Sequence, residues 1–345
     1  MIKPKRLQRG ARIAVTAPSS GLAARFPAVY RRGLSVLRKR FGFDLIEMPT
    51  ARMTGKDLHG APEKRARDIN DAFGDESVDG ILTTIGGDDS MRLLPLLDVE
   101  LARTHPKLII GGSDATTFLS YLSLHDLVTF YGPSVMAGFA QTDSLPREFA
   151  EHLEDFFFGD WDSYTYTPFP RFTHGYEDWS NPAAAGACLP FHENPGPRTI
   201  QAGNGVATGR LWGGCLEVLE LLKGTPYWPS PDFFEGKILF LETSEEKPSP
   251  LWVGRYLRNY GLQGVLAGIS ALLIGRPKDY SDEERAELRR IVRIVVTEEL
   301  GLEHLPIVTD LDFGHTDPKH LLPLGIKAEV DPAGPTVRLL ESPFG

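Results

Sequence analysis

The sequence predicts an α/β protein with two domains, and three features of the chain lead to this prediction. Short apolar segments without polar alternation are separated by amphipathic segments, a pattern typical of parallel strands covered by helices on both faces. The pattern occurs in the first half of the chain and again, after an aromatic and proline-rich stretch, in the second half. A chain of 345 residues is long enough for two domains of ordinary size.

In the first half, four short apolar runs end at turn signals and are expected to be strands. They cover residues 11–17, 43–48, 79–85 and 106–110. Apolar residues at helical spacing predict a helix around residues 30–37, and a charged helix over residues 61–73 is expected to end at Gly74. Ligands of parallel sheets bind at the carboxyl ends of the strands, so the loops after residues 85 and 110 are the first candidates for a site.

The second half follows a connector over residues 159–204, which is rich in proline and aromatic residues and is expected to pack or to fold over a site. A helix near residues 216–223 and strands at 237–241, 271–275 and 305–310 are expected there. Ser281 and Glu284 form a capping-box pattern at the start of a further helix, which Gly301 is expected to close. The expected division is therefore an N-terminal domain over 1–158, the connector over 159–204 and a C-terminal domain over 205–345.

Composition and charge exclude several classes of function. The net charge is −9 and no lysine- or arginine-rich block is present, so nucleic acid and anionic membrane surfaces are poor partners. No apolar run reaches the roughly 18 residues of a membrane-spanning helix. The basic first ten residues lack the apolar core of a signal peptide, and Cys188 and Cys215 fit neither a disulfide scaffold nor zinc spacing. These features favour a cytoplasmic, enzyme-sized protein.

Ser113 lies in the glycine-flanked turn over residues 111–118, between an expected strand and an expected helix. A serine on such a sharp turn is exposed, and the N-terminal N–H groups of the following helix can stabilise an oxyanion. The alternative is a serine that only caps the helix, which is common at this position. The motif lacks the GxSxG pattern, so both interpretations stay open at this point.

Glu242 and His315 follow strands of the second half. Glu242 comes directly after the run over 237–241, where a carboxylate can orient a histidine; the alternative is a solvated carboxylate beside Glu245 and Glu246. His315 follows Gly314 and is a candidate general base; the alternative is a loop histidine bonded to a neighbouring aspartate. A serine, a histidine and an acid at strand ends together favour a Ser–His–Glu hydrolase.

Two further patterns suggest other chemistry. The loop over residues 86–90 resembles the glycine-rich loop of NAD and diacylglycerol kinases, but Asp89 adds negative charge where a phosphate would lie. Acidic residues and histidines also gather near the end of the chain (Asp310, Asp312, His315, Asp317, His320), although Pro318 disfavours helical ligand spacing. We therefore rank phosphoryl transfer and metal binding below hydrolysis, and expect no metal and no cofactor.

Two residues outside these motifs have open interpretations. Trp179 lies in the connector and could stack on a planar group of a ligand, or it could pack within the connector. Cys215 lies at the start of an apolar helix and is expected to be part of the core rather than a nucleophile.

Taken together, the ordered motifs resemble the serine L,D-carboxypeptidases, which include the microcin C immunity peptidases. The resemblance extends along nearly the whole chain, through residues 10–20, 84–94, 112–114, 209–214, 239–242, 314–316 and 322–325. It implies a flavodoxin- or class I amidotransferase-like, doubly wound N-terminal domain and a swivelling α/β C-terminal domain. It also implies a site between the domains, and commonly a homodimer.

The resemblance assigns roles to five residues. Ser113 is the implied nucleophile, His315 the general base and Glu242 its partner, and the backbone amides of Gly87 and Asp114 form the implied oxyanion hole. Cys215 departs from the family pattern, because many relatives carry asparagine after the two glycines.

The loop over 86–90, Trp212 and the long connector are similar to the immunity-peptidase branch, whose members resemble amidases acting on aminoacyl-nucleotide conjugates. On this basis Asp88, Trp179, Trp212 and Lys247 are expected to contact the substrate. A murein tetrapeptide losing its terminal D-alanine, as in peptidoglycan recycling, is the alternative substrate. A nucleotide kinase and a non-catalytic binding module are the competing classes of protein.

Overall fold

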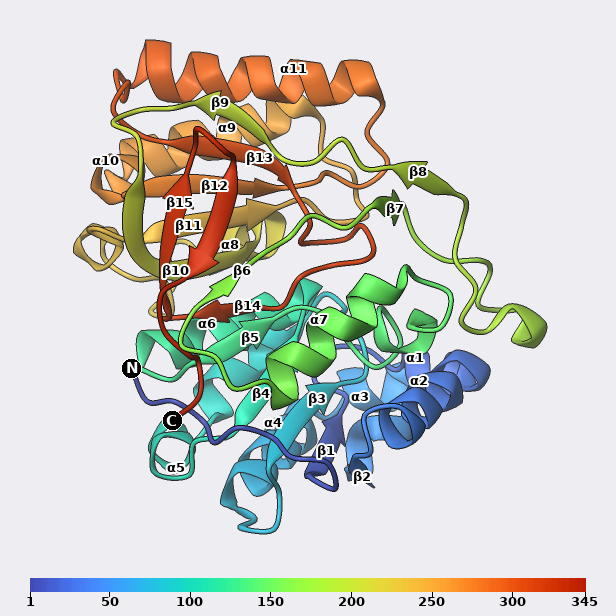
Figure 1. The fold of residues 1–345 in the computed structure, drawn as a ribbon. Helices are drawn as coiled ribbons and strands as arrows, with labels where there is room; N and C mark the ends of the chain where they lie inside the picture. Colours follow the sequence, from blue (N-terminus) through green and yellow to red (C-terminus); the bar gives the residue numbers. More distant parts are fainter.

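The computed structural model describes residues 1–345 (Figure 1). It contains two large sheets whose central strands are parallel, and the central strands of each sheet come from one half of the chain. The first sheet has the order β14-β5-β4-β3-β1-β2. Its parallel strands are β1 (Arg12–Thr16), β2 (Asp44–Glu47), β3 (Gly80–Thr83), β4 (Leu108–Gly111) and β5 (Thr129–Tyr131). The strands β3 and β4 are wholly buried, since helices cover both faces of the sheet. The expected α/β class is confirmed.

The helices of the first half follow the predicted pattern. The segment α2 (Pro27–Lys39) buries Tyr30, Leu34 and Leu37, and α4 (Pro62–Gly74) ends at the glycine that the sequence indicated. Shorter helices are α1 (Leu22–Arg25), α3 (Gly55–His59) and α5 (Val99–Thr104), while α6 (Thr116–Leu124) and α7 (Arg147–Phe158) complete this half. The short helix α6 begins directly beyond the turn that holds Ser113.

The second sheet has eight strands in the order β6-β16-β15-β10-β11-β12-β13-β9. Its centre is parallel: β10 (Ala207–Cys215), β11 (Ile238–Glu242), β12 (Ala271–Gly275) and β13 (Ile307–Leu311). The helices α8 (Leu216–Leu222), α9 (Pro250–Leu262), α10 (Val265–Gly268) and α11 (Asp282–Arg293) accompany it. The predicted capping box is present at the start of α11, which continues into a π-helical turn over Ile294–Glu299.

The connector is ordered and supplies strands to the second half. It contains β6 (Tyr164–Thr165) and β9 (Arg198–Gln201), which join the second sheet, and the pair β7 (Arg171–Thr173) and β8 (Phe191–Glu193). Figure 1 shows the segment between β7 and β8 reaching toward α1 and α2 of the first half. The expectation that this stretch packs rather than remains a disordered linker agrees with its hydrogen bonds and aromatic contacts.

The end of the chain returns to the first half. The strand β14 (Leu322–Leu324) pairs antiparallel with β5, whereas β15 (Lys327–Asp331) and β16 (Thr336–Leu339) belong to the second sheet. Both termini lie beside one another, where Gly345 N–H donates to Pro4 O (Figure 1). The boundaries at residues 158 and 204 stay a prediction, since the last strands cross between the two sheets.

None of the helices combines the length and the apolar character that crossing a membrane requires.

Candidate active site

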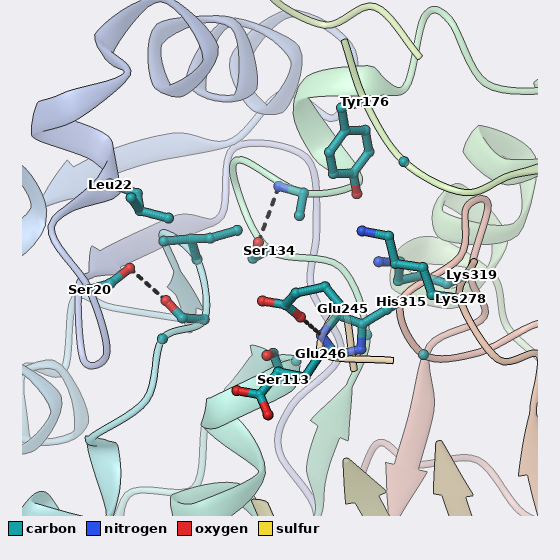
Figure 2. Close-up of a pocket in the computed structure, with 18 of the residues that line it drawn as sticks. Ser20, Leu22, Ser113, Ser134, Tyr176, Glu245, Glu246, Lys278, His315 and Lys319 are labelled. Carbon is teal, nitrogen blue, oxygen red and sulfur yellow. Dashed lines mark hydrogen bonds and ion pairs between the residues drawn. The ribbon is translucent and has the colours of Figure 1, made fainter. Parts of the chain in front are cut away.

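A cavity of about 500 Å³ lies where loops from both halves of the chain meet (Figure 2). The first half contributes Gly86, Gly87 and Ser113, which follow strands β3 and β4. The second half contributes Glu245 and His315, which follow strands β11 and β13. The cavity therefore opens at the carboxyl ends of both parallel sheets, where ligands of such sheets bind.

Ser113 stands on a strained turn between β4 and α6. Its φ is +57°, a left-handed conformation that a non-glycine residue adopts only when the surroundings enforce it. Gly86 packs directly against it: a Cβ on Gly86 would lie 2.7 Å from Ser113 Cβ and 3.0 Å from Ser113 Oγ. The turn exposes the hydroxyl to the cavity, as expected for a nucleophile elbow, and the side chain makes no N-cap hydrogen bond.

The loop over residues 86–90 is fixed to this turn. Ser90 N–H donates to Asp114 Oδ2 at 3.0 Å, and Ser90 Oγ donates to Asp114 O at 2.8 Å. Asp89 accepts hydrogen bonds from the fully buried Arg65 at 2.5 Å and from Arg92 at 3.0 Å. Asp89, which departs from the glycine-rich kinase pattern, thus anchors the loop through its carboxylate. The carboxylate does not lie where a phosphate would bind.

Two backbone amides near this turn belong to Gly87, in the loop over residues 86–90, and to Asp114, which follows Ser113. Gly87 N–H donates no hydrogen bond within the chain, and Gly87 lines the cavity. The Asp114 amide lies close to Gly86, since a Cβ added to Gly86 would be 3.5 Å from Asp114 N. The Asp114 carboxylate is buried and accepts a hydrogen bond from Ser90 N–H. The resemblance implied that these two amides form an oxyanion hole, and that role stays a prediction.

Glu242 and His315 are in direct contact. The His315 Nδ1 atom lies 2.8 Å from Glu242 Oε2, and the Glu242 side chain is 0% exposed at the end of β11. Gly314, at φ +105°, leaves room for this contact, since a Cβ there would lie 2.5 Å from Glu242 Oε2. Burial alone would raise the pKa of Glu242, but the charge and hydrogen bond of His315 and the hydrogen bond of Tyr131 lower it below the ordinary value.

The other ring nitrogen of His315 contacts a second carboxylate. His315 Nε2 lies 3.0 Å from Glu245 Oε2, and Glu245 is 60% exposed at the rim of the cavity. Burial of the imidazole favours the neutral ring, but Glu242 and Glu245 outweigh it and raise the pKa of His315 to about 9. The hydrogen bond from His315 in turn lowers the pKa of Glu245 to about 2. Sequence reasoning treated Glu245 only as a member of an acidic cluster and did not identify this contact.

The four expected substrate contacts divide into two groups. Asp88 and Trp179 line the cavity, and Trp179 stacks on Tyr176 with ring centroids 5.6 Å apart. Trp212 is 1% exposed and packs against Phe234, so the structure places it in the core, away from the cavity. Its expected contact with the substrate is wrong for this structure, because strand β10 turns this side chain into the second half's interior.

Lys247 also lies outside the cavity. Its Nζ atom pairs with Glu284 Oε2 at 2.9 Å, at the start of α11. The lysines that do line the cavity are Lys278 and Lys319, which the sequence analysis missed. Lys278 lies in a loop without a recognisable motif, and Lys319 lies four residues after His315, where no pattern distinguished it from a surface lysine.

The residues considered for a metal site are used in other contacts. Asp312 pairs with the buried Arg276 at 2.5 Å, and Asp310 pairs with Arg289 at 3.1 Å. Asp317 accepts a hydrogen bond from Tyr176 Oη, and His320 Nε2 contacts Thr167 O at 3.1 Å. No three His, Cys, Asp or Glu side chains gather as a group that could hold a metal ion. Cys215 is buried, as expected for a core residue.

Comparisons with known proteins identify the family to which this chain is similar. Family models described as the LD-carboxypeptidase N-terminal domain and C-terminal domain match residues 13–132 and 208–330. The microcin C7 self-immunity protein MccF of Escherichia coli is 31% identical over 87% of this chain and 84% of its own. A Bacillus subtilis protein named "Probable murein peptide carboxypeptidase" is 26% identical over 97% of this chain and 93% of its own.

A solved structure gives the same result for the fold. MccF in complex with glutamyl sulfamoyl guanosine superposes with a TM-score of 0.88 and 26% identity, and the match covers 100% of both chains. The full coverage confirms the predicted pair of α/β domains in their MccF-like arrangement. The chain therefore belongs to the LD-carboxypeptidase family, within its MccF-like branch, and is a hydrolase of the carboxypeptidase type.

Proposed function

We propose that this hydrolase uses Ser113, His315 and Glu242 as a catalytic triad and cleaves an amide-type bond in an aminoacyl-nucleotide conjugate. The contact between Glu242 and His315 Nδ1 carries the first part of the proposal, because it leaves Nε2 as the nitrogen that accepts a proton. Ser113 Oγ, on its strained turn, opens into the same cavity as that imidazole.

The proposed reaction passes through an acyl-enzyme. Ser113 Oγ attacks the scissile carbonyl while His315 Nε2 takes the hydroxyl proton, and the amides of Gly87 and Asp114 hold the oxyanion. The C–N bond then breaks as His315 returns the proton to the leaving nitrogen. Water, deprotonated by His315, hydrolyses the resulting ester and restores Ser113. In this sequence of steps Glu245 has to leave Nε2 before the base can act.

The stacked Tyr176–Trp179 pair on the cavity wall supports a substrate with a planar group. The Nε1 atom of Trp179 is buried without a hydrogen-bond partner, so a ligand in the cavity could accept from it. The relative MccF was solved with a sulfamoyl nucleoside, which is the same class of ligand. A murein tetrapeptide is the second candidate substrate, supported by the name of the Bacillus subtilis relative.

The first experiment compares these two substrates directly. Purified protein is incubated, with EDTA present, with an aminoacyl sulfamoyl-adenosine and with a murein tetrapeptide, and the products are identified by mass spectrometry. Cleavage of the adenosine conjugate alone supports the proposal, whereas release of D-alanine alone assigns the chain to murein cleavage. Cleavage that persists with EDTA present and without added ATP excludes a kinase, which would need Mg²⁺ and ATP.

Replacement of the nucleophile tests the mechanism. We expect Ser113→Ala to lower turnover by on the order of 10⁴-fold or more while the thermal unfolding midpoint stays unchanged. Glu242→Gln is expected to lower it less, because a poorly oriented base still accepts protons. Undiminished hydrolysis by Ser113→Ala would refute the proposed triad. A homodimer, a cytoplasmic location and a place in peptidoglycan recycling stay predictions.

A further inference from the structure

Tyr131 is buried at the end of β5. Its hydroxyl contacts two members of the proposed triad, Ser113 and Glu242. Ser113 N–H donates to Tyr131 Oη at 3.1 Å, and Tyr131 Oη donates to Glu242 Oε1 at 2.5 Å. We propose that Tyr131 is a positioning residue that fixes the acid of the triad and the nucleophile's backbone relative to one another. This inference rests on the proposed function of Ser113, Glu242 and His315.

The burial of Glu242 makes the hydroxyl necessary. One carboxylate oxygen of Glu242 bonds His315, and the other bonds Tyr131. Gly275 and Gly314 pack so closely that a Cβ on either would come within 3.0 Å of Glu242, so the carboxylate has little space for another rotamer. Without the Tyr131 hydroxyl, Oε1 would be a buried, charged acceptor with no donor, which is an unfavourable state for a carboxylate.

The same hydroxyl holds the turn that carries the nucleophile. Ser113 has a left-handed backbone, and Tyr131 Oη accepts the hydrogen bond of its amide. The Ser113 amide is therefore engaged within the protein and is not a donor to an oxyanion. That assignment leaves the N–H groups of Gly87 and Asp114 for the oxyanion, in agreement with the proposed mechanism.

A continuous chain of hydrogen bonds thus runs from Ser113 N–H through Tyr131 and Glu242 to His315. Burial, together with the nearby charge of Glu242, raises the pKa of Tyr131, so the phenol stays protonated and continues to donate. Both hydrogen-bonding directions of the hydroxyl are used inside the protein. We therefore expect Tyr131 to influence turnover and the titration of His315 rather than the affinity for substrate.

Removing the hydroxyl has a defined electrostatic consequence. Glu242 loses a donor that stabilises its charge, becomes more basic and holds the His315 proton more strongly. The acid limb of the pH–rate profile should therefore move to higher pH. The substitution leaves the other titratable groups near this series of hydrogen bonds in place. These groups are Glu245, Lys278 and Lys319 from the surrounding loops, Cys215 from β10 and Glu217 from α8.

Tyr131→Phe is compared with Tyr260→Phe, a matched control. Tyr260 is equally buried, but its hydroxyl has no hydrogen-bond partner and lies outside the cavity. The readout is the rate at which diisopropyl fluorophosphate modifies the serine, measured across the pH range in which His315 titrates. We expect Tyr131→Phe to slow labelling by about 10²-fold, with the midpoint at higher pH, and Tyr260→Phe to match the unchanged protein. Equal rates and equal midpoints for all three proteins would overturn the inference.

A double-mutant cycle separates positioning from a general loss of stability. If Tyr131 acts through Glu242, Tyr131→Phe should change the labelling rate little in a Glu242→Gln background. The rates are measured at a temperature at which every variant is folded, as judged by thermal unfolding. If the effects of the two substitutions on the labelling rate are additive, the inference is overturned. Labelling of Ser113→Ala at the unchanged rate would instead refute the proposed nucleophile, so the two failures are distinguishable.

Discussion

At the scale of single residues, His315 is the group whose surroundings most affect the proposed chemistry. Its imidazole lies between Glu242 and Glu245, at 2.8 and 3.0 Å, and these two carboxylates raise its pKa to about 9 against the effect of burial. The ring is therefore an imidazolium near neutral pH and is not free to accept a proton. The raised pKa also stabilises the fold below pH 6.5, and this contribution is lost as the pH rises through about 9.

Glu245→Gln is expected to lower the pKa of His315 toward the ordinary value, because one of its two carboxylates is removed. The acid limb of kcat/KM should then move to lower pH, and activity at neutral pH should rise by up to about tenfold for each unit that the pKa falls. The pH dependence of kcat/KM measures this effect. Glu246→Gln is the control, since Glu246 lines the same cavity without contacting His315. An acid limb at the same pH in both variants would contradict the expectation.

At the scale of elements, the loop over residues 86–90 and the turn at Ser113 form one rigid unit. The loop is held by the ion pair of Asp89 with Arg65 and by the hydrogen bonds of Ser90 with Asp114. Because these anchors limit its movement, the loop cannot easily withdraw from Ser113. The space between the two segments therefore depends on Gly86 having no side chain.

Gly86→Ala is expected to displace the Ser113 hydroxyl, because the added Cβ would lie 2.7 Å from Ser113 Cβ. Activity should fall by about 10- to 10²-fold, and the free energy of unfolding should fall by about 1–3 kcal/mol from overpacking. Steady-state kinetics and urea unfolding measure the two effects. Gly55→Ala is the matched control, since a Cβ there meets no atom within 4 Å. Full activity of Gly86→Ala would show that the elbow tolerates movement.

At the scale of the whole molecule, the two halves of the chain share strands and termini. Strand β14 from the second half completes the first sheet, and Lys3 pairs with Glu341 at 2.9 Å. Phe344 stacks on Phe130 of β5, with ring centroids 5.7 Å apart. The hydrogen bond between Tyr131 Oη and Glu242 Oε1 also joins the halves. These contacts make separate unfolding of either half unfavourable.

We therefore expect urea to unfold the chain in a single cooperative transition. The sequence allows a direct test, because all five tryptophans lie between residues 161 and 252, in the connector and the second half. Tryptophan fluorescence reports on these segments, whereas far-UV circular dichroism reports on the helices of both halves. Coincident midpoints would confirm the expectation, and two separate midpoints would show that the halves unfold independently.

The sequence by itself determined the class of fold and the positions of most central elements. Apolar runs such as those in β3, β11 and β12 predicted buried parallel strands because hydrophobic periodicity is a local property of the chain. The motifs around Ser113 and His315 likewise identified the strand ends where the cavity lies. The strands β5 and β14 were not predicted, because each has three residues and is stabilised by partners distant in sequence.

Only the tertiary structure decided which side chains meet at the site. Tyr131 and Glu242 are separated by 111 positions, so no local pattern could predict their hydrogen bond. The same reason explains why Glu245 on His315 was missed and why Trp212 was expected in the cavity rather than in the core. Local chemistry predicts that a residue lies on a strand or at its end. The topology of the two sheets then decides which strand ends face each other and which side chains they bring into contact.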